Sequence, residues 1–263
     1  MSRPTGSVRF DNAGRVVLVT GGLGGIGLAI CEAFAGSKAA GVVAVDCRTP
    51  GEMPPGVVYF QANLADETEC AAAVQFAIER FGGLDVLVNT AAIQPPESYV
   101  PVDELPAEVW ERMLSINVSG YTYMAKHALR QMKAQRSGVV VNIASAQAFR
   151  TARGVPAYGP AKAANVMQAR QWGVEYARHG IRVVSVSPGA IRTPLLLASL
   201  AAQGGGDALA NRHPLGRLGE PHEVAAAVLW LASNNAAFVT ATDLAVDGGL
   251  DAFGAFADPY SPA

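Results

Sequence analysis

Six short apolar runs, separated by longer helical stretches, constrain the fold of this 263-residue chain more than any other feature. The runs are continuously apolar, as in "RVVLVT" and "GVVVNIAS", instead of alternating apolar with polar residues. Such runs are typical of strands that are buried on both faces of a parallel sheet. Together with a last run near the C-terminus, the predicted strands cover 15–20, 41–46, 57–60, 84–89, 138–145, 181–187 and 238–246.

Helical stretches rich in Ala, Leu and charged residues lie between these runs. The predicted helices cover 25–36, 67–81, 107–135, 157–179 and 221–234. This repeated β-α-β order predicts an α/β fold: a single-domain, doubly wound (Rossmann) parallel sheet of about seven strands with helices on both faces. We expect one domain over residues 1–263, a mobile substrate lid at about 190–220 and a C-terminal tail at 251–263.

The charge balance argues against nucleic acid or a membrane surface as the partner. Only 16% of the residues are charged and the net charge is −2, so no basic field attracts nucleic acid or acidic lipids. The apolar runs are short and the first residues are polar, so we expect no membrane association and a cytoplasmic protein. The odd number of cysteines (Cys31, Cys47 and Cys70) and the lack of a C-x-x-C pair favour free thiols. We expect no metal site.

Five glycines occur in the segment "TGGLGGIG" at residues 20–27, between the first predicted strand and the first predicted helix. Glycines at such a junction let backbone N–H groups and the helix N-terminus meet the pyrophosphate of a dinucleotide. The string can be parsed as G-x-G-x-x-G, with Gly22, Gly24 and Gly27. It can also be parsed as T-G-x-x-x-G-x-G, with Thr20, Gly21, Gly25 and Gly27.

Asp46 ends the second predicted strand, 19 residues after Gly27. At this distance a carboxylate can accept hydrogen bonds from the ribose hydroxyls of the adenosine half, and it would repel a 2′-phosphate. Gly24 and Cys47 provide no cation for that phosphate, and the nearby Arg48 follows the acid. The sequence therefore favours NAD(H) over NADP(H).

A second group of residues carries proton-transfer chemistry. In "YGPAK", Tyr158 and Lys162 are four residues apart and lie on one face of the predicted helix. A free phenol, with a pKa of about 10, is a poor base at neutral pH. An ammonium about 4 Å away, at an effective dielectric constant of about 20, would lower this pKa by roughly three units. Ser145 ends a predicted strand at the edge where doubly wound folds bind ligands, so its hydroxyl can bond a substrate oxygen.

These motifs, in this order, resemble the short-chain dehydrogenase/reductase family from about Gly14 to Gly249. The resemblance selects the T-G-x-x-x-G-x-G parse. It extends to Asn117 in "SINVSG", to "SPG" at 187–189 and to "VDGG" at 246–249. One departure is Thr240–Ala241, where the family has Thr-Gly before the last strand.

The resemblance implies catalytic roles for Asn117, Ser145, Tyr158 and Lys162. Tyr158 would exchange a proton with the substrate oxygen, which Ser145 would hold and polarise. Lys162 would lower the pKa of Tyr158 and bind the nicotinamide ribose. Asn117 would hold a water molecule that links Lys162 to solvent.

The resemblance also implies a set of residues that contact the cofactor. Among them, Asn63 takes the place of an aspartate that contacts adenine, and the Ile191 backbone and the Thr193 hydroxyl orient the carboxamide. The full set is Thr20, Gly21, Leu23, Gly24, Gly25, Ile26, Gly27, Asp46, Asn63, Leu64, Asn89, Ala91, Tyr158, Lys162, Pro188, Gly189, Ile191 and Thr193.

The substrate is less constrained by the sequence. Gln94 and Gln147 can bond hydroxyl or carbonyl groups. Arg150 and Arg153 could bind an anionic substrate, or they could face solvent or a subunit interface. We expect a dehydrogenase of a polyol, sugar or other secondary alcohol. The alternatives are a carbonyl reductase that resembles 3-oxoacyl carrier-protein reductases and a non-catalytic NAD-binding regulator. The resemblance also implies a homotetramer.

Overall fold

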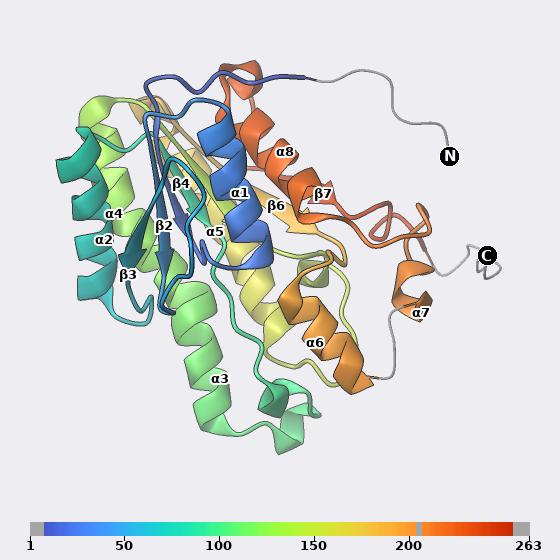
Figure 1. Cartoon of the computed structure of the whole chain (residues 1–263). Helices are drawn as coiled ribbons and strands as arrows, with labels where there is room; N and C mark the ends of the chain where they lie inside the picture. Colours follow the sequence, from blue (N-terminus) through green and yellow to red (C-terminus); the bar gives the residue numbers. More distant parts are fainter. Residues whose placement is uncertain (1–7, 204–206, 255–263) are drawn as a thin grey trace.

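A computed structural model describes residues 8–203 and 207–254. Its seven strands form one sheet in the order β3-β2-β1-β4-β5-β6-β7, and all neighbouring strands are parallel. The strands are β1 (Val16–Thr20), β2 (Gly41–Asp46), β3 (Val57–Gln61), β4 (Val86–Asn89), β5 (Gly138–Ile143), β6 (Ile181–Pro188) and β7 (Asp243–Val246). Their carboxyl ends therefore meet at one edge, on the side of α3 and α6 in Figure 1. This arrangement confirms the predicted doubly wound sheet.

Helices cover both faces of the sheet (Figure 1). The helices are α1 (Gly25–Gly36), α2 (Glu67–Phe81), α3 (Ala107–Leu114), α4 (Gly120–Gln135), α5 (Tyr158–Tyr176), α6 (Pro194–Gln203), α7 (Asp207–Ala210) and α8 (Pro221–Ala232). In β1, Val16 and Leu18 join the core under α2, α4 and α5, whereas Val17 and Val19 join the core under α1 and α8. Because each strand supplies apolar side chains to two cores, its sequence is continuously apolar.

The helix boundaries follow local signals in the sequence. Asp66 caps α2 by accepting the N–H groups of Thr68 and Glu69, and Gly82 ends this helix in a left-handed conformation. At α8, Pro221 occupies the first turn and Glu223 accepts the Glu220 N–H. Both predicted starts, at 67 and 221, are therefore confirmed.

The predicted helix at 107–135 is interrupted, which the sequence pattern did not indicate. Residues Ser115–Ser119 form a π-helical segment between α3 and α4. Side chains of α5 bond its carbonyl oxygens: Asn165 Nδ2 donates to Asn117 at 2.9 Å, and Gln168 Nε2 donates to Val118 at 3.2 Å. The helix that begins with Tyr158 thus also supports the segment that contains Asn117.

The predicted strand at 238–246 is wrong in its first half, because β7 begins only at Asp243. Ala241 has a left-handed φ of 56°, which is incompatible with a strand. Helix α5 also approaches this point closely, since a Cβ on Gly173 would lie 2.7 Å from the Ala241 nitrogen. The departure from Thr-Gly at 240–241 therefore places a methyl group where the backbone favours glycine.

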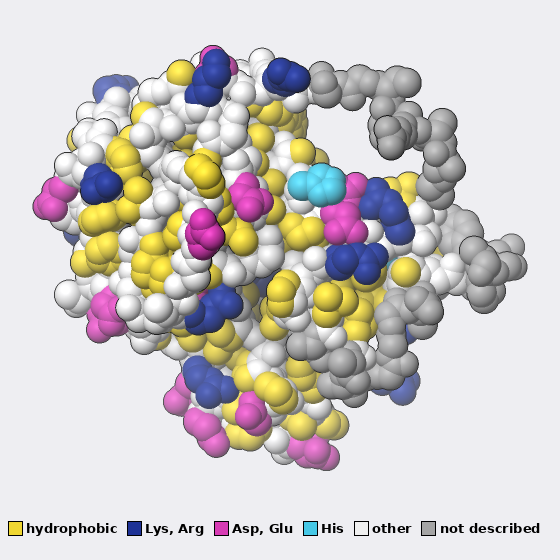
Figure 2. Space-filling view, in the orientation of Figure 1, with side chains coloured by type: hydrophobic (Ala, Val, Ile, Leu, Met, Phe, Trp, Pro, Cys, Tyr) yellow, Lys and Arg dark blue, Asp and Glu magenta, His cyan; other side chains and the backbone are white. Residues whose placement is uncertain are grey.

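The 190–220 segment contains α6 and α7 and is closed at its base beside the end of β6. Gly219 N donates to Ala190 O at 2.9 Å, and Arg192 N donates to Gly219 O at 2.8 Å. On the face shown in Figure 2, basic side chains are interspersed with acidic ones over the described residues. Within the described part of the chain, none of the helices has the length and apolarity needed to cross a bilayer. Residues 255–263 of the predicted tail lie outside the described residues.

Replacement of Ala241 by glycine should stabilise the protein. The left-handed conformation of an alanine costs about 1–2 kcal/mol, which exceeds the extra chain entropy of glycine, so we expect a gain of about 0.5–1 kcal/mol in urea unfolding. Ala237→Gly is the matched control, because Ala237 has a right-handed backbone with φ −57°. It should lose about 0.5–1 kcal/mol. Equal losses in both variants would contradict this account.

Candidate active site at the carboxyl edge of the sheet

The glycine loop joins β1 to α1 at the carboxyl edge. Gly21 has a φ of 64°, and a Cβ there would lie 2.8 Å from Ala91 Cα. A Cβ on Gly27 would collide with the Gly21 carbonyl oxygen. At Gly24, in contrast, a Cβ would meet only that oxygen, at 3.2 Å. A Cβ on Gly22 would lie 2.8 Å from Ala44 Cα, so the close approach of backbone and neighbouring atoms requires glycine at 21, 22 and 27, and the family resemblance alone selects the parse.

The start of α1 can receive an anion. Its N-cap residue is Gly24, which makes no side-chain hydrogen bond, so no capping side chain covers the first N–H groups of the helix. Such a helix start binds phosphate through its N–H groups and its dipole. A Cβ on Gly25 would lie 2.8 Å from Thr193 Cγ2, so the loop packs directly against the residues that follow β6.

Asp46 lies buried at the end of β2, beside the glycine loop. It accepts the Leu23 N–H at 3.2 Å, and it accepts Arg48 through Nε and Nη2, both at 3.0 Å. Burial acts to raise the pKa of the Asp46 carboxyl. The hydrogen bonds from Arg48 and Leu23 outweigh burial and hold the pKa below its ordinary value. A charged carboxylate is therefore present where the sequence predicts the adenosine ribose.

Two other predicted cofactor residues make structural hydrogen bonds. Thr20 supports the loop, since its Oγ1 accepts the N–H groups of Thr90 and Ala91 at 3.0 and 3.2 Å. Asn89, however, is fully buried within the sheet, and its amide donates to Asn142 Oδ1 of β5 at 3.0 Å. The Asn89 side chain therefore joins two strands, and the structure does not bring it to the surface of the predicted cofactor site.

Ser145, Tyr158 and Lys162 converge beyond the end of β5. Ser145 follows the strand and Tyr158 is the first residue of α5, and the Ser145 hydroxyl is near enough to Tyr158 to act on its pKa. Lys162 is one turn further along α5, with Nζ 5.7 Å from the centroid of the Tyr158 ring. Three polar groups, separated in sequence, thus meet at the edge where α/β folds bind their ligands.

The electrostatics of this cluster differ from the prediction. Burial raises the pKa of Tyr158 to about 12, with a further increase from Tyr99 and an opposing hydrogen bond from Ser145. Burial also lowers the pKa of Lys162 to about 7. In the chain by itself the net shift of the Tyr158 pKa is therefore upward, opposite to the predicted direction, because desolvation disfavours the charged form of both groups.

Asn117 lies in the π-helical segment and is fully buried. Its side chain closes a pair of hydrogen bonds with Ile93: Oδ1 accepts the Ile93 N–H at 2.8 Å and Nδ2 donates to the Ile93 carbonyl at 2.9 Å. The side chain therefore fixes the loop after β4, which leads to Gln94. The water predicted at Asn117 remains a prediction.

The four predicted substrate residues have different surroundings. Gln147 is adjacent to the predicted catalytic group, because its N–H donates to Ser145 Oγ at 3.1 Å, and its Oε1 is buried without a hydrogen-bond partner among the described residues. Gln94 is partly buried. Arg150 donates through Nε to the Asp251 carboxylate at 2.9 Å and to the Asp251 carbonyl at 2.6 Å, and Arg153 is exposed. Arg150 therefore links the loop after β5 to the C-terminal segment.

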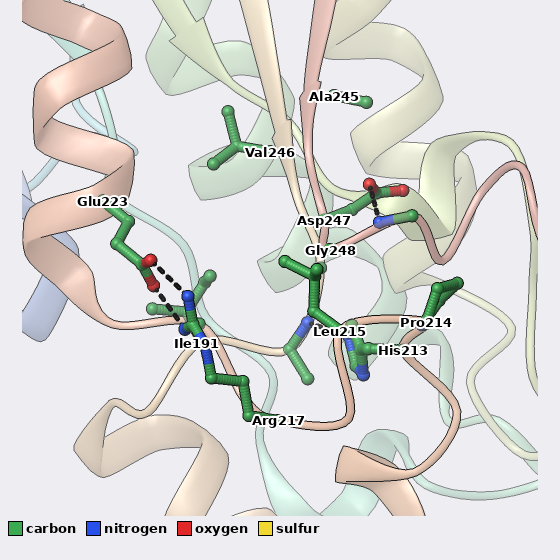
Figure 3. Close-up of a pocket in the computed structure, with 14 residues that line it drawn as sticks. Ile191, His213, Pro214, Leu215, Arg217, Glu223, Ala245, Val246, Asp247 and Gly248 are labelled. Carbon is green, nitrogen blue, oxygen red and sulfur yellow. Dashed lines mark hydrogen bonds and ion pairs between the residues drawn. The ribbon is translucent and has the colours of Figure 1, made fainter. Parts of the chain in front are cut away.

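A cavity of about 470 Å³ is lined by the turn that follows β6, by residues at the end of β7 and by residues between 213 and 219 (Figure 3). Its described lining includes Gly189, Ala190 and Ile191, three residues of the turn. His213 of the 190–220 segment also lines it, and the Arg217–Glu223 ion pair borders it.

Sequence reasoning missed the role of His213, which is 1% exposed. Its Nε2 accepts the Ala190 N–H at 3.0 Å, so Nδ1 carries the proton that is donated to Leu209 O at 2.9 Å. His213 thus connects the 190–220 segment to the turn that precedes Ile191. A lone histidine before Pro214 gives no signal of this contact in the sequence.

Comparison with known proteins identifies the family. The sequence profile described as enoyl-(acyl carrier protein) reductase matches residues 21–251. The chain is 38% identical over 252 residues to a 2,5-dichloro-2,5-cyclohexadiene-1,4-diol dehydrogenase of Sphingobium indicum, covering 92% of this chain and 99% of that protein. The chain belongs to the short-chain dehydrogenase/reductase family. The resemblance inferred from the sequence is therefore confirmed, and the protein is an oxidoreductase that uses a nicotinamide cofactor.

Two further comparisons cover nearly the whole of this short-chain dehydrogenase/reductase. A cis-4-hydroxycyclohexanecarboxylate dehydrogenase of Sinomonas cyclohexanicum is 38% identical over 248 residues, covering 91% of this chain and 98% of that protein. The ligand-free structure of aldohexose dehydrogenase from Thermoplasma acidophilum has a TM-score of 0.88 at 31% identity, covering 95% of this chain and 98% of that chain.

Proposed function

We propose that this protein is an NAD-dependent dehydrogenase of secondary alcohols, with Tyr158 as general base and acid. The observation that carries the proposal is the convergence of Ser145, Tyr158 and Lys162 beside the glycine loop at one edge of the sheet. A proton acceptor, an oxygen-binding hydroxyl and a buried amine suit removal of the hydroxyl proton of a CH–OH group, while the nicotinamide cofactor would accept the hydride from its carbon.

The described residues fit a nicotinamide dinucleotide. Gly21 and Gly27 allow the loop to turn tightly against Ala91 and against itself, and the uncapped start of α1 suits the pyrophosphate. The buried Asp46 carboxylate suits two ribose hydroxyls and would repel a 2′-phosphate, which supports NAD. When bound, the cofactor supplies the hydride acceptor, and the protein supplies position and electrostatics.

Residues of the chain itself bind the substrate oxygen and transfer the hydroxyl proton. Ser145 holds the substrate oxygen, and Tyr158 takes the hydroxyl proton onto its phenolic oxygen. Lys162 favours the phenolate only in its ammonium form, so a proton must be retained on an amine whose pKa is about 7. The positive charge of an oxidised nicotinamide ring would favour the phenolate in the same direction. Asn117 keeps the loop after β4 in place by bonding Ile93.

Gln147 supports a substrate that carries a second hydroxyl group. Its buried Oε1 has no partner among the described residues, and a buried acceptor without a hydrogen bond costs about 1–3 kcal/mol. A second hydroxyl on the substrate would donate to it. The relatives named above act on a cyclohexadiene diol, a hydroxycyclohexane and an aldohexose, so we favour a ring alcohol or polyol as the substrate class.

The same proposal includes a cytoplasmic homotetramer with a mobile lid at 190–220. The three cysteines are free, and two of them, Cys31 and Cys70, are buried thiols, which suits a reducing compartment. On α5, Met167 and Val174 are 58% and 74% exposed, so this helix offers apolar area for a second copy of the chain.

Turnover with a panel of alcohols tests the proposal. We expect NADH formation from at least one cyclic or open-chain diol, and Tyr158→Phe should reduce kcat by about 10²–10⁴-fold while NADH binding is retained, since only the proton acceptor is lost. Acetoacetyl thioesters in the reductive direction test the reductase alternative. NADH binding without turnover of any substrate would instead support the regulator.

Asp46→Ser tests the choice of cofactor. The variant removes the charge that repels a 2′-phosphate and releases Arg48, which now bonds Asp46. We expect the ratio of kcat/KM with NAD to kcat/KM with NADP to fall by about 100-fold, roughly 3 kcal/mol of charge-assisted hydrogen bonding. In Asp46→Ser/Arg48→Ser, the gain with NADP should disappear. An unchanged ratio in the single variant would show that Asp46 does not select NAD.

A further inference from the structure

Tyr121 is a second phenol at the catalytic lysine. It lies in the first turn of α4, is fully buried, and comes from a different helix than Lys162. Its hydroxyl is 3.3 Å from Lys162 Nζ and 3.1 Å from the carbonyl oxygen of Ile143, and Lys162 Nζ donates to the same carbonyl at 2.8 Å. The three polar atoms form a closed triangle at the end of β5.

The chemistry of these groups fixes the direction of each hydrogen bond. The carbonyl of Ile143 can only accept, so it receives one proton from Tyr121 and one from Lys162. The Tyr121 oxygen, having donated its proton, accepts a second N–H of Lys162. The pKa of Tyr121 is raised well above its ordinary value, by burial first and by Tyr158 second, so the phenol keeps its proton.

The triangle restricts the orientation of the amine. An ammonium has three N–H groups, and two of them are bonded to Ile143 and Tyr121. The third has no partner among the described residues, while the Tyr158 ring centroid lies 5.7 Å from Nζ. Without the Tyr121 hydroxyl, one backbone carbonyl would hold the amine, and rotation about the last bond of the side chain would no longer be restricted.

We propose that Tyr121 is a positioning residue for the reaction: its hydroxyl stabilises the ammonium form of Lys162 and fixes its orientation, which leaves one N–H for the site beside Tyr158. Tyr121 acts through Lys162 and does not contact the substrate. Its catalytic consequence rests on the proposed alcohol dehydrogenase function.

No carboxylate among the described residues bonds Lys162, and burial is the cause that lowers its pKa. The neighbouring titratable groups are the two phenols, Tyr121 from α4 and Tyr158 from α5. The oxygen of Tyr121 is therefore the one side-chain acceptor that the described residues provide for this amine, in addition to the Ile143 carbonyl.

Lysine titration by NMR tests the inference without turnover. The chain has four lysines, so protein labelled with ¹³C at lysine Cε gives four signals, and Lys162→Met assigns the buried one. Tyr121→Phe removes one acceptor and keeps the ring. Since a hydrogen bond to a charged group is stronger than one to a neutral group, we expect the pKa of Lys162 to fall by about one pH unit. Tyr123→Phe, in the same helix, should leave it unchanged.

The pH dependence of turnover provides the second measurement. Less charge on Lys162 disfavours the Tyr158 phenolate, so the acid limb of alcohol oxidation in Tyr121→Phe should move up by about one pH unit. In the Lys162→Met background the same substitution should have no further effect on kcat/KM, because Tyr121 acts through the lysine.

The outcomes separate the two proposals. A lowered lysine pKa in a protein that turns over no alcohol would overturn the proposed function and retain the role of Tyr121. An unchanged lysine pKa in folded Tyr121→Phe would overturn the role of Tyr121, whatever the activity. If Tyr121→Phe does not fold, Tyr121→Met replaces it. A reduction of kcat/KM by Tyr121→Met that is as large in the Lys162→Met background as in the wild-type background would also overturn the role of Tyr121.

Discussion

A lysine amine buried at the end of a central strand is the constraint on which the active site depends. Lys162 is 1% exposed, and burial lowers its pKa to about 7. Near neutrality, desolvation favours the neutral amine, whereas its two hydrogen bonds favour the ammonium form. Removal of a buried charge from water costs several kcal/mol, and good hydrogen-bond geometry must offset this cost. Strand β5 provides the carbonyl, α4 provides the Tyr121 hydroxyl, and α5 provides the lysine itself. The position of each element therefore affects the chemistry.

Direct contacts at the sheet edge hold the residues that are predicted to bind the cofactor. Thr193 packs on Gly25 of the glycine loop, and His213 holds the Ala190 N–H of the turn after β6. The π-helical segment adds a third link, because Asn117 bonds Ile93 while Asn165 of α5 bonds the Asn117 carbonyl. The glycine loop, the turn after β6 and α5 are thus each held by residues that are distant in the sequence.

The sequence predicted what short spacings determine. Continuous apolar runs predicted the strands, and the four-residue separation of Tyr158 and Lys162 predicted their shared helix face. It did not predict contacts between distant positions: Lys162 with Tyr121, His213 with Ala190, or Arg150 with Asp251. It also predicted the wrong direction for the Tyr158 pKa, because pairwise Coulomb reasoning considered the neighbouring cation and omitted the burial of both groups. Burial is a property of the packed chain, so local pattern could not supply it.

Burial keeps Tyr158 protonated until the positive charge of an oxidised nicotinamide ring enters the site. The direct test is a pH titration of phenolate absorbance, taken as the difference between wild type and Tyr158→Phe, with and without saturating NAD⁺. We predict that the free protein shows no Tyr158 phenolate below about pH 10, and that NAD⁺ lowers the apparent pKa of Tyr158. A Tyr158 phenolate that titrates near neutral pH without NAD⁺, or one that NAD⁺ does not shift, would contradict the account.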